Sequence, residues 1–256
     1  MQPSYALVTG ASQGLGKVFA EALAARKQNV VLVARSKEKL EALASELKAS
    51  QGILAEPLEF DLAHPLSGQH LAEQLRERGL RIDLLVNNAG FGERGEFWKL
   101  TLECQLGMIH LHNTALVELT YHLLQPMIER RYGGIVNISS TAGFQPIPYA
   151  TLYSATKSFL TTFSVGLEEE ARPFGVKVVT VCPGRIRTKS RSHQNGGWKL
   201  PDGKQDREEV VHETLRALDQ GGGLVVPGLV NKFTVFAERF IPRSVVPKIV
   251  AKMARP

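Results

Sequence analysis

The sequence predicts an α/β protein whose parallel sheet is covered by helices on both faces. Short runs rich in β-branched residues, such as "NVVLVA" and "GVKVVTVC", alternate with longer helical patterns along all 256 residues. The runs are apolar at successive positions, as in strands that are buried on both sides. No low-complexity linker or internal repeat interrupts this alternation. We therefore expect one domain rather than two.

Each element is predicted from the spacing of apolar residues. Strands are expected at 5–10, 29–34, 53–60, 82–88, 133–140 and 175–182. Helices, with apolar residues three and four positions apart, are expected at about 16–27, 36–50, 65–78, 101–131 and 153–172. Pro126 has no backbone N–H, so we expect it to bend or interrupt the long helix. In such sheets ligands bind at the carboxyl ends of the strands, so the loops there matter most.

The composition is that of an ordinary globular protein, with 43% hydrophobic and 22% charged residues. Cys104 and Cys182 have no Cys or His at metal-ligand spacing, so we expect no disulfide, no metal site and a reducing, cytoplasmic setting. The strand expected at 5–10 leaves no room for a secretory signal. The longest stretch without charged residues, 132–156, is rich in Gly, Pro, Ser and Thr, which is not typical of a membrane span.

The net charge of +6 is scattered along the chain. It suits solubility and phosphorylated ligands. Nucleic acid is disfavoured as a partner because no recognised binding module accompanies the charge.

The loop after the first strand reads "TGASQGLG" and contains Gly10, Gly14 and Gly16. Glycines between a strand and a helix N-terminus let backbone N–H groups approach a pyrophosphate. The spacing G-x3-G-x-G differs from the common G-x-G-x-x-G, and a tight strand-to-helix turn is the alternative.

The next three strands also end in informative residues. Arg35 follows the second strand, where NAD sites usually carry an acid, and a cation there suits the additional phosphate of NADPH. The alternative is an arginine that merely faces solvent. Asp61, after the third strand, could accept a hydrogen bond from an adenine amine or cap the next helix. The fourth strand ends in "NNAG" (87–90), small or amide-bearing residues that suit either a cofactor or a turn.

Residues 139–159 read "SSTAGFQPIPYATLYSATKSF". Tyr153 and Lys157 are four residues apart and share one face of the predicted helix, whereas Tyr149 has no such lysine. A free phenol has a pKa of about 10, and a neighbouring ammonium stabilises its anion. The pair therefore has the chemistry of a general acid for carbonyl reduction.

The motifs "TGASQGLG", "NNAG", a serine thirteen residues before "YSATK", and "CPGRIRT" occur in this order. Together they resemble the short-chain dehydrogenases/reductases, in their short single-domain branch, over about residues 5–188, with similarity to 3-oxoacyl and ketone reductases. The resemblance implies a Rossmann-type, doubly wound parallel sheet of seven strands with helices on both faces, and a nicotinamide cofactor.

The resemblance also implies four catalytic residues. Tyr153 would protonate the carbonyl oxygen as hydride leaves the nicotinamide, and Ser140, rather than Ser139, would hold that oxygen. Lys157 would bind the nicotinamide ribose and lower the pKa of Tyr153. Asn113 would support a proton-relay water.

Tyr153, Lys157 and the loops after the strands are expected to contact NADP(H). The loop residues are Gly10, Ser12, Gln13, Gly14, Leu15, Gly16, Arg35, Asp61, Leu62, Asn88, Ala89, Gly90, Pro183, Gly184, Ile186 and Thr188. Phe91, Phe144 and Tyr149 are expected either to line an apolar wall near the nicotinamide or to pack in the core.

Two segments depart from the common family pattern. Residues 185–207 carry seven Lys or Arg against two Asp. They would form a substrate loop that recognises an anionic handle of an acyl thioester, or simply a solvated loop. Residues 229–256 are expected to form an amphipathic helical extension packed on the catalytic domain, 1–228. Its apolar stripe suits a subunit contact or a substrate lid better than membrane contact.

The sequence thus predicts an NADPH-dependent oxidoreductase that reduces a 3-oxoacyl thioester, or a hydrophobic ketone or aldehyde, to an alcohol. The alternative is a non-catalytic NADPH-binding sensor that binds partner proteins. Such proteins commonly lose the tyrosine or lysine, whereas this sequence retains all four catalytic-type residues. We expect a homodimer or homotetramer with a small-molecule substrate.

Overall fold

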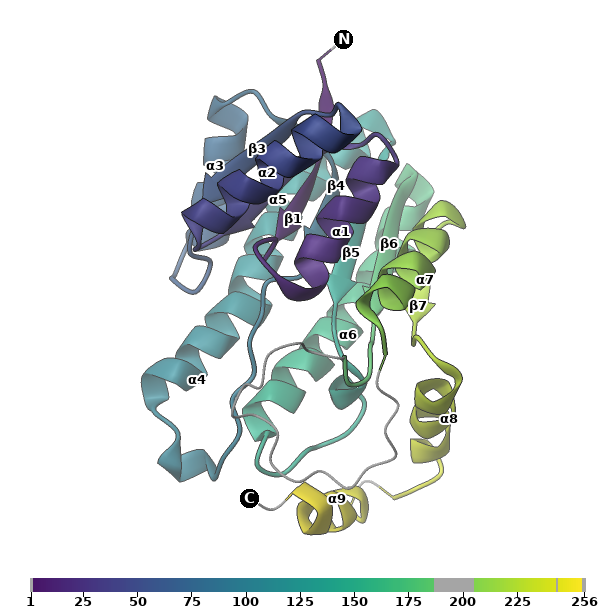
Figure 1. Cartoon of the computed structure of the whole chain (residues 1–256). Coiled ribbons are helices and arrows are strands. Elements are labelled where there is room, and N and C mark those ends of the chain that lie inside the picture. Colours follow the sequence, from purple (N-terminus) through teal and green to yellow (C-terminus); the bar gives the residue numbers. More distant parts are fainter. Residues whose placement is uncertain (1, 187–204, 243, 255–256) are drawn as a thin grey trace.

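A parallel β-sheet forms the centre of the protein (Figure 1). The structure, a computed structural model, describes residues 2–186, 205–242 and 244–254. Within these residues the sheet has seven strands in the order β3-β2-β1-β4-β5-β6-β7, and every neighbouring pair is parallel. The strands are β1 (Ser4–Thr9), β2 (Asn29–Ala34), β3 (Ala55–Glu59), β4 (Arg81–Asn87), β5 (Gly133–Ile138), β6 (Val176–Val181) and β7 (Gly223–Val225). The predicted Rossmann-type fold is confirmed.

Helices cover both faces of the sheet. They are α1 (Gly14–Ala25), α2 (Lys37–Gln51), α3 (Ser67–Glu77), α4 (Leu102–Ile109), α5 (Ala115–Arg130), α6 (Thr151–Ala171), α7 (Arg207–Asp219), α8 (Leu229–Glu238) and α9 (Val246–Ala254). One apolar core lies beneath α1, α2 and α7, and the other lies beneath α3, α5 and the end of α6. Because side chains alternate along a strand, Ala6 and Val8 of β1 enter the first core and Leu7 enters the second.

The strand order reverses beside β1, which pairs with β2 on one side and with β4 on the other. In doubly wound sheets the loops that lead away from such a reversal in opposite directions form a crevice at the carboxyl ends of the strands, where dinucleotides bind. The fold therefore brings the loops after β1, β4 and β5 to one end of the molecule.

The helix expected at 101–131 differs from the prediction. It runs through Pro126, which lies inside α5, and its irregularity instead lies at His110–Thr114, one turn of π-helix between α4 and α5. A π turn inserts one residue into a helix and is frequent at functional sites. The irregular turn lies beside α6, the helix that carries Tyr153.

The C-terminal helices lie at the same end of the molecule as the carboxyl ends of the strands (Figure 1). Val246 and Val250 of α9 pack against Ala142, Ile147 and Ala150, which belong to the segment after β5. Helix α9 therefore covers part of the predicted active-site loop. In the described part of the chain, no helix combines the length and the hydropathy that crossing a membrane requires.

Candidate active site

The glycine loop after β1 is folded tightly against its neighbours. Gly14 has a φ of +63°, a left-handed conformation that suits glycine. A Cβ on Gly16 would lie 2.3 Å from the carbonyl oxygen of Gly10, so the first turn of α1 packs directly on the loop. Both glycines are thus required by the backbone, and the N-terminus of α1 remains open to an anion.

Hydrogen bonds join this loop to the loop after β4. The Asn88 side chain donates to the carbonyl oxygen of Thr9 over 2.8 Å. The Thr9 hydroxyl accepts from the backbone N–H groups of Asn88 and Ala89 at 2.9 and 3.0 Å. Asn88 therefore connects the end of β4 to the end of β1.

The residues expected near the adenosine have mixed environments. Arg35 is exposed directly after β2 and Gln13 is exposed at the start of α1, whereas Leu15 and Leu62 are buried in the two cores. The Asp61 carboxylate accepts a hydrogen bond from the N–H of Ala63 over 2.9 Å. This contact closes a local turn after β3. Asp61 does not cap α3, whose N-cap residue is Leu66, and its contact with an adenine amine stays a prediction.

The two serines at the end of β5 have different environments. Ser139 is buried, and its hydroxyl donates to the Lys157 carbonyl over 2.9 Å and contacts the Thr161 hydroxyl at 2.7 Å. Ser140 is only half-buried, and its hydroxyl accepts from the N–H of Ala142 over 3.1 Å. Ser139 therefore bonds to α6. The Ser140 hydroxyl is the more accessible of the two to a substrate oxygen.

Tyr153 and Lys157 lie one turn apart on α6, as predicted. The Lys157 ammonium lies 5.9 Å from the centre of the Tyr153 ring and donates to the carbonyl oxygen of Ile138 over 2.8 Å. A Cβ on Gly92 would lie 3.1 Å from the Tyr153 ring, so the loop after β4 passes close over the phenol.

The electrostatics of this pair differ from the expectation. Burial raises the pKa of Tyr153, and the neighbouring Ser140 and Arg94 act in the opposite direction without cancelling it. Burial lowers the pKa of Lys157 to about 8. We expected Lys157 to lower the pKa of Tyr153, but in this structure its ammonium is directed to the Ile138 carbonyl.

His112 joins the site although the sequence analysis did not single it out. It is buried in the π turn, with Nδ1 2.9 Å from the Thr156 hydroxyl. Its Nε2 accepts from the N–H of Phe91 over 3.2 Å, and its ring meets the Tyr153 ring edge-on at 5.9 Å. A Cβ on Gly90 would lie 2.9 Å from that Nε2. His112 therefore joins the loop after β4 to the helix that carries Tyr153.

Burial, together with the nearby Lys157 charge, lowers the pKa of His112 well below its usual range. The folded protein thus binds a proton there less readily than the unfolded chain, so the His112 contribution to stability should be lost as the pH falls below about 6.5. Below a pH of about 6.5, the unfolding free energy of the wild type should fall as the pH falls. In His112→Asn this slope should be smaller by up to about 1.4 kcal/mol per pH unit. Urea unfolding at several pH values measures the slope. The exposed His70→Asn serves as the control, and equal slopes for His112→Asn and wild type would contradict the prediction.

The remaining predicted residues lie around this centre or outside the described residues. Asn113 follows His112 in the π turn, and its Oδ1 is buried without a hydrogen-bond partner among the described residues. The Pro183 carbonyl accepts from the N–H of Thr141 over 3.0 Å, and the N–H of Gly184 donates to Gln205 over 3.0 Å. Ile186 forms an isolated bridge with Gln205. Thr188 and most of the basic loop, 187–204, lie outside the described residues.

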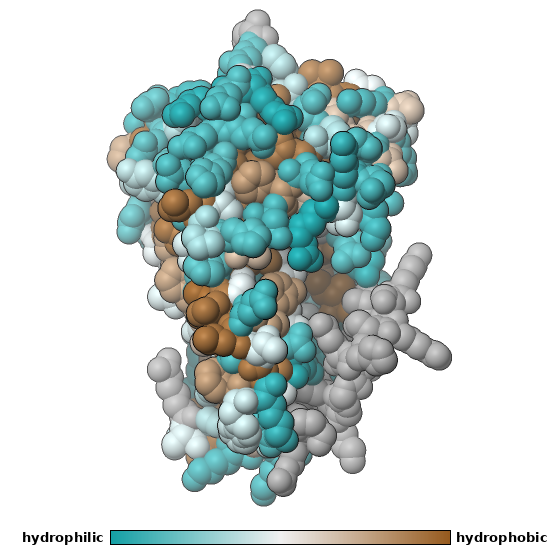
Figure 2. Space-filling view, turned by 90° about the vertical axis from the view of Figure 1, so that its left-hand side faces the viewer, coloured by the Kyte–Doolittle hydropathy of each residue, from teal (hydrophilic) through white to brown (hydrophobic). Residues whose placement is uncertain are grey.

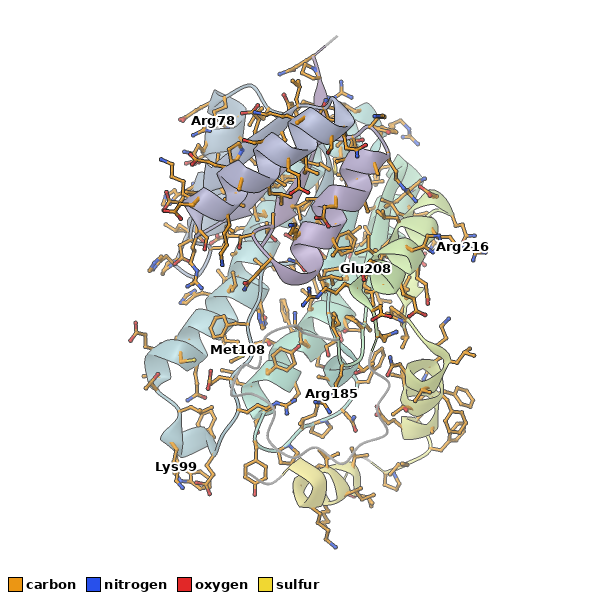
Figure 3. The ribbon with its side chains drawn as sticks, viewed as in Figure 1. Arg78, Lys99, Met108, Arg185, Glu208 and Arg216 are labelled. Carbon is orange, nitrogen blue, oxygen red and sulfur yellow. The ribbon has the colours of Figure 1, made fainter. Side chains whose placement is uncertain are left out.

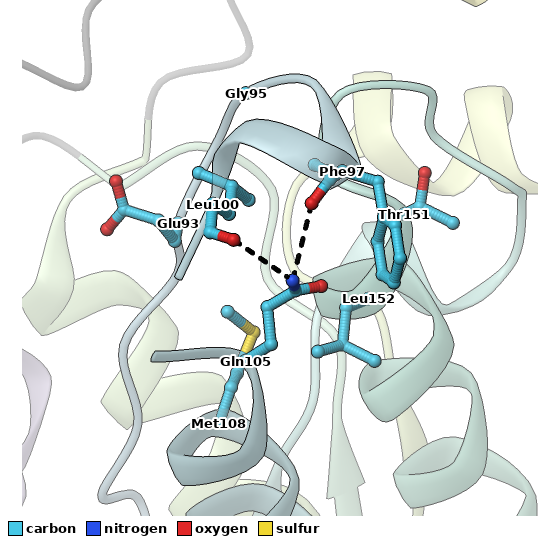
Figure 4. A pocket seen from close by; sticks show the side chains of 9 residues that line it. Glu93, Gly95, Phe97, Leu100, Gln105, Met108, Thr151 and Leu152 are labelled. Atoms are coloured by element: carbon cyan, nitrogen blue, oxygen red, sulfur yellow. Dashed lines mark hydrogen bonds between the residues drawn. The ribbon is translucent and has the colours of Figure 1, made fainter. Parts of the chain in front are cut away.

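A small pocket lies beside the start of α6 (Figure 4). It is lined by Glu93, Gly95, Phe97, Leu100, Gln105, Met108, Ala150, Thr151 and Leu152. The Gln105 amide donates to the carbonyl oxygens of Phe97 and Leu100 over 3.3 and 3.5 Å. Figure 3 places Met108 and Arg185 at the end of the molecule that holds the carboxyl ends of the strands, and Arg78 at the opposite end.

The described residues contain no cluster of three or more His, Cys, Asp or Glu that could hold a metal ion.

Comparisons with known proteins agree with this geometry. A family model described as short chain dehydrogenase matches residues 4–197. The chain belongs to the short-chain dehydrogenase family. This confirms the resemblance found in the sequence, and the protein is an oxidoreductase with a nucleotide-binding Rossmann fold.

Three relatives of this short-chain dehydrogenase are informative. It is 36% identical to rat 17-beta-hydroxysteroid dehydrogenase type 3 over 220 residues, which are 85% of this chain and 70% of that protein. It is 37% identical to human very-long-chain 3-oxoacyl-CoA reductase over 191 residues, 72% of this chain and 60% of the human protein. A short-chain dehydrogenase from Sphingobium yanoikuyae, solved in complex with NADPH, is 33% identical with a TM-score of 0.80 over 93% of each chain.

The residues of this short-chain dehydrogenase fit a nicotinamide dinucleotide. Gly16 brings the N-terminus of α1 against the loop without a side chain in the way, and Arg35 offers a cation after β2. Lys157 offers an ammonium beside the carboxyl end of β5. These are suitable donors for the phosphates and the ribose of such a cofactor.

Proposed function

We propose that the protein is an NADPH-dependent carbonyl reductase that converts a 3-oxoacyl thioester, or a hydrophobic ketone or aldehyde, to an alcohol. The observation that carries the proposal is the convergence of Tyr153, Ser140 and Lys157 on one side of the crevice. The glycine loop lies at the carboxyl end of the same sheet. When bound there, NADPH would supply the hydride.

Tyr153 donates the proton to the carbonyl oxygen in this proposal. Burial raises its pKa, so the phenol is protonated at neutral pH and is ready to act as an acid rather than as a base. The half-buried Ser140 hydroxyl donates a hydrogen bond to the same oxygen as negative charge develops on it. The protonated phenol is the form that carbonyl reduction requires.

Lys157 and His112 position the acid. The Lys157 ammonium holds the end of β5 through the Ile138 carbonyl and is the donor expected for the ribose. His112 holds the loop at Phe91 through Nε2 and packs its ring against Tyr153. We propose no separate step for Asn113 beyond support of a relay water from the π turn.

The proposal that NADPH is preferred over NADH rests on Arg35. Arg35→Asp should lower kcat/KM with NADPH by about 100-fold and change kcat/KM with NADH by less than about threefold, because only NADPH carries the phosphate that the guanidinium would bind. Steady-state rates with each cofactor measure the ratio. The exposed Arg78→Asp, at the far end of the molecule, is the matched control; similar losses with both cofactors would contradict the assignment.

The substrate class is proposed from the apolar surroundings of the site and from the names of the relatives. Tyr149 and Tyr153 pack beside the cluster of Ala142, Ile147 and Ala150, and Phe91 lies against His112. A rat relative is named for a hydroxysteroid and a human one for a very-long-chain 3-oxoacyl-CoA. Cofactor oxidation across a panel of ketones and 3-oxoacyl thioesters tests the class. Tight NADPH binding without turnover on any of them would favour the sensor instead.

A homodimer or homotetramer is proposed for the assembly. Helix α4 exposes Leu102 and Leu106, and α5 exposes Tyr121. Apolar residues gather among polar ones on this side of the molecule (Figure 2). Such a patch suits a subunit contact, and light scattering measures the assembly.

A further inference from the structure

Helix α8 and the turn after it expose a row of large apolar side chains. We call Leu229, Phe233, Phe236 and Phe240 the α8 stripe; they are 83%, 72%, 56% and 74% exposed. Their spacing of three and four residues places Leu229, Phe233 and Phe236 on one side of the helix axis, and Phe240 follows in the turn after α8. The Phe236 and Phe240 rings also contact one another, with centroids 5.3 Å apart.

The opposite face of α8 holds the helix to the protein. Val235 is buried, and the Asn231 amide donates to the Pro227 carbonyl over 3.0 Å. A Cβ on Gly184 would lie 2.5 Å from the Asn231 side chain, so the helix packs directly on the loop after β6. The stripe therefore points outward from a helix that is anchored, and it does not close over the crevice as a lid would.

Basic side chains accompany the stripe. Lys232 of α8 and Arg239, directly after the helix, are exposed, although Lys232 also approaches Glu213 of α7 at 3.8 Å. On α9, Lys248 and Lys252 are exposed while Val246 and Val250 face the protein. Residues 229–256 contain six Lys or Arg and one acid, Glu238. The described residues of this surface are thus both apolar and cationic.

The charge decides between two occupants of this surface. A two-fold contact with a second copy would pair the same patch with itself and bring the basic residues of both copies together. The like charges would oppose that contact. An anionic bilayer satisfies both features, because aromatic side chains enter the boundary of the headgroups and lysines contact the headgroups.

We propose that the α8 stripe, with the exposed lysines of α9, is a peripheral surface that binds anionic lipid bilayers. Because α9 packs on the segment that precedes Tyr153, bilayer contact would place the active-site end of the protein at the lipid surface. An apolar substrate dissolved in the bilayer would then reach the crevice from the lipid side. The surface itself does not depend on the proposed reaction.

Co-sedimentation of the full-length protein with vesicles tests the proposal. One set of vesicles is pure phosphatidylcholine, and in the other a third of the lipid is phosphatidylglycerol. We expect the anionic vesicles to bind at least about 10-fold more tightly, since each basic residue near such a surface adds to the affinity. Phe233→Gln/Phe236→Gln should weaken binding to the anionic vesicles by at least about 10-fold. Lys248→Gln/Lys252→Gln should remove most of the preference for them.

The matched control is Leu54→Gln/Phe174→Gln. These exposed apolar residues lie just before β3 and β6, at the amino ends of the strands and away from the C-terminal helices (Figure 1), and this variant should bind vesicles as the wild type does. Equal weakening in the control, or no binding of the wild type to either vesicle, would overturn the proposal. A dimer in light scattering that dissociates in Phe233→Gln/Phe236→Gln, without vesicle binding by the wild type, would assign the stripe to a second copy instead.

Discussion

Tyr153→Phe is expected to lower kcat for carbonyl reduction by about 1,000-fold, the range that removal of a positioned general acid produces. The phenyl ring keeps the edge-on contact with His112 and the packing beneath Gly92, so the loss would come from the hydroxyl alone. NADPH affinity should stay within about twofold because the phenol proton is needed in the reaction and not for ground-state binding. Single-turnover oxidation of bound NADPH measures the chemical step, and a fluorescence titration measures the affinity.

Tyr149→Phe is the matched control for this experiment. Tyr149 lies in the same segment and beside the same apolar cluster. Its backbone has a φ of +62°, and its carbonyl accepts a hydrogen bond from the N–H of Gly95, so these contacts do not need the phenol hydroxyl. Its variant should keep kcat within about threefold, since no reacting group is removed. A large loss in Tyr149→Phe with near-normal turnover in Tyr153→Phe would reverse the assignment.

Lys157→Met should have the second large effect, lowering kcat/KM by at least about 100-fold, because a charged donor is lost from the reaction site. It also leaves the Ile138 carbonyl without its buried donor, which should cost about 1–3 kcal/mol of unfolding free energy. Wild-type kcat/KM should fall above a pH of about 8, where Lys157 loses its proton. The raised pKa of Tyr153 keeps the phenol from limiting the rate in that range.

The pH profile of the residual activity separates this role from a structural one. The alkaline decline should be absent from the residual activity of Lys157→Met, whereas loss of stability alone would leave the decline in place. Lys48→Met, an exposed change on α2, is the control and should keep both the rate and the pH profile. A decline at the same pH in Lys157→Met would assign that ionisation to another group.

The strands and the glycine loop could be predicted because their signals are local. Successive apolar residues such as 30–34 predict a buried strand whatever surrounds them, and the four-residue spacing of Tyr153 and Lys157 predicts a shared helical face. The order of the strands needed the resemblance to a family, because pairing between distant segments leaves no local pattern.

The features that were missed depend on three-dimensional contacts. The π turn at His110–Thr114 has no distinct composition. Pro126 was the stronger local signal for a break in the helix, although α5 runs through it. In the sequence His112 does not differ from other histidines in helices. Its role depends on the contacts of its two ring nitrogens with Phe91 and Thr156. Its position directly before Asn113 was the one available signal.

The packing of α9 against the segment after β5 links two parts of the chain that lie about a hundred residues apart in sequence. Val246 and Val250 can leave that segment only if the apolar cluster of Ala142, Ile147 and Ala150 is opened to water. A ligand that orders this segment therefore also disfavours detachment of α9. By linkage, attachment of α9 strengthens binding of that ligand by the same free energy. The resistance of the C-terminal residues to a protease thus becomes a reporter of occupancy in the crevice, and hydrogen exchange in α9 should slow when the crevice is filled.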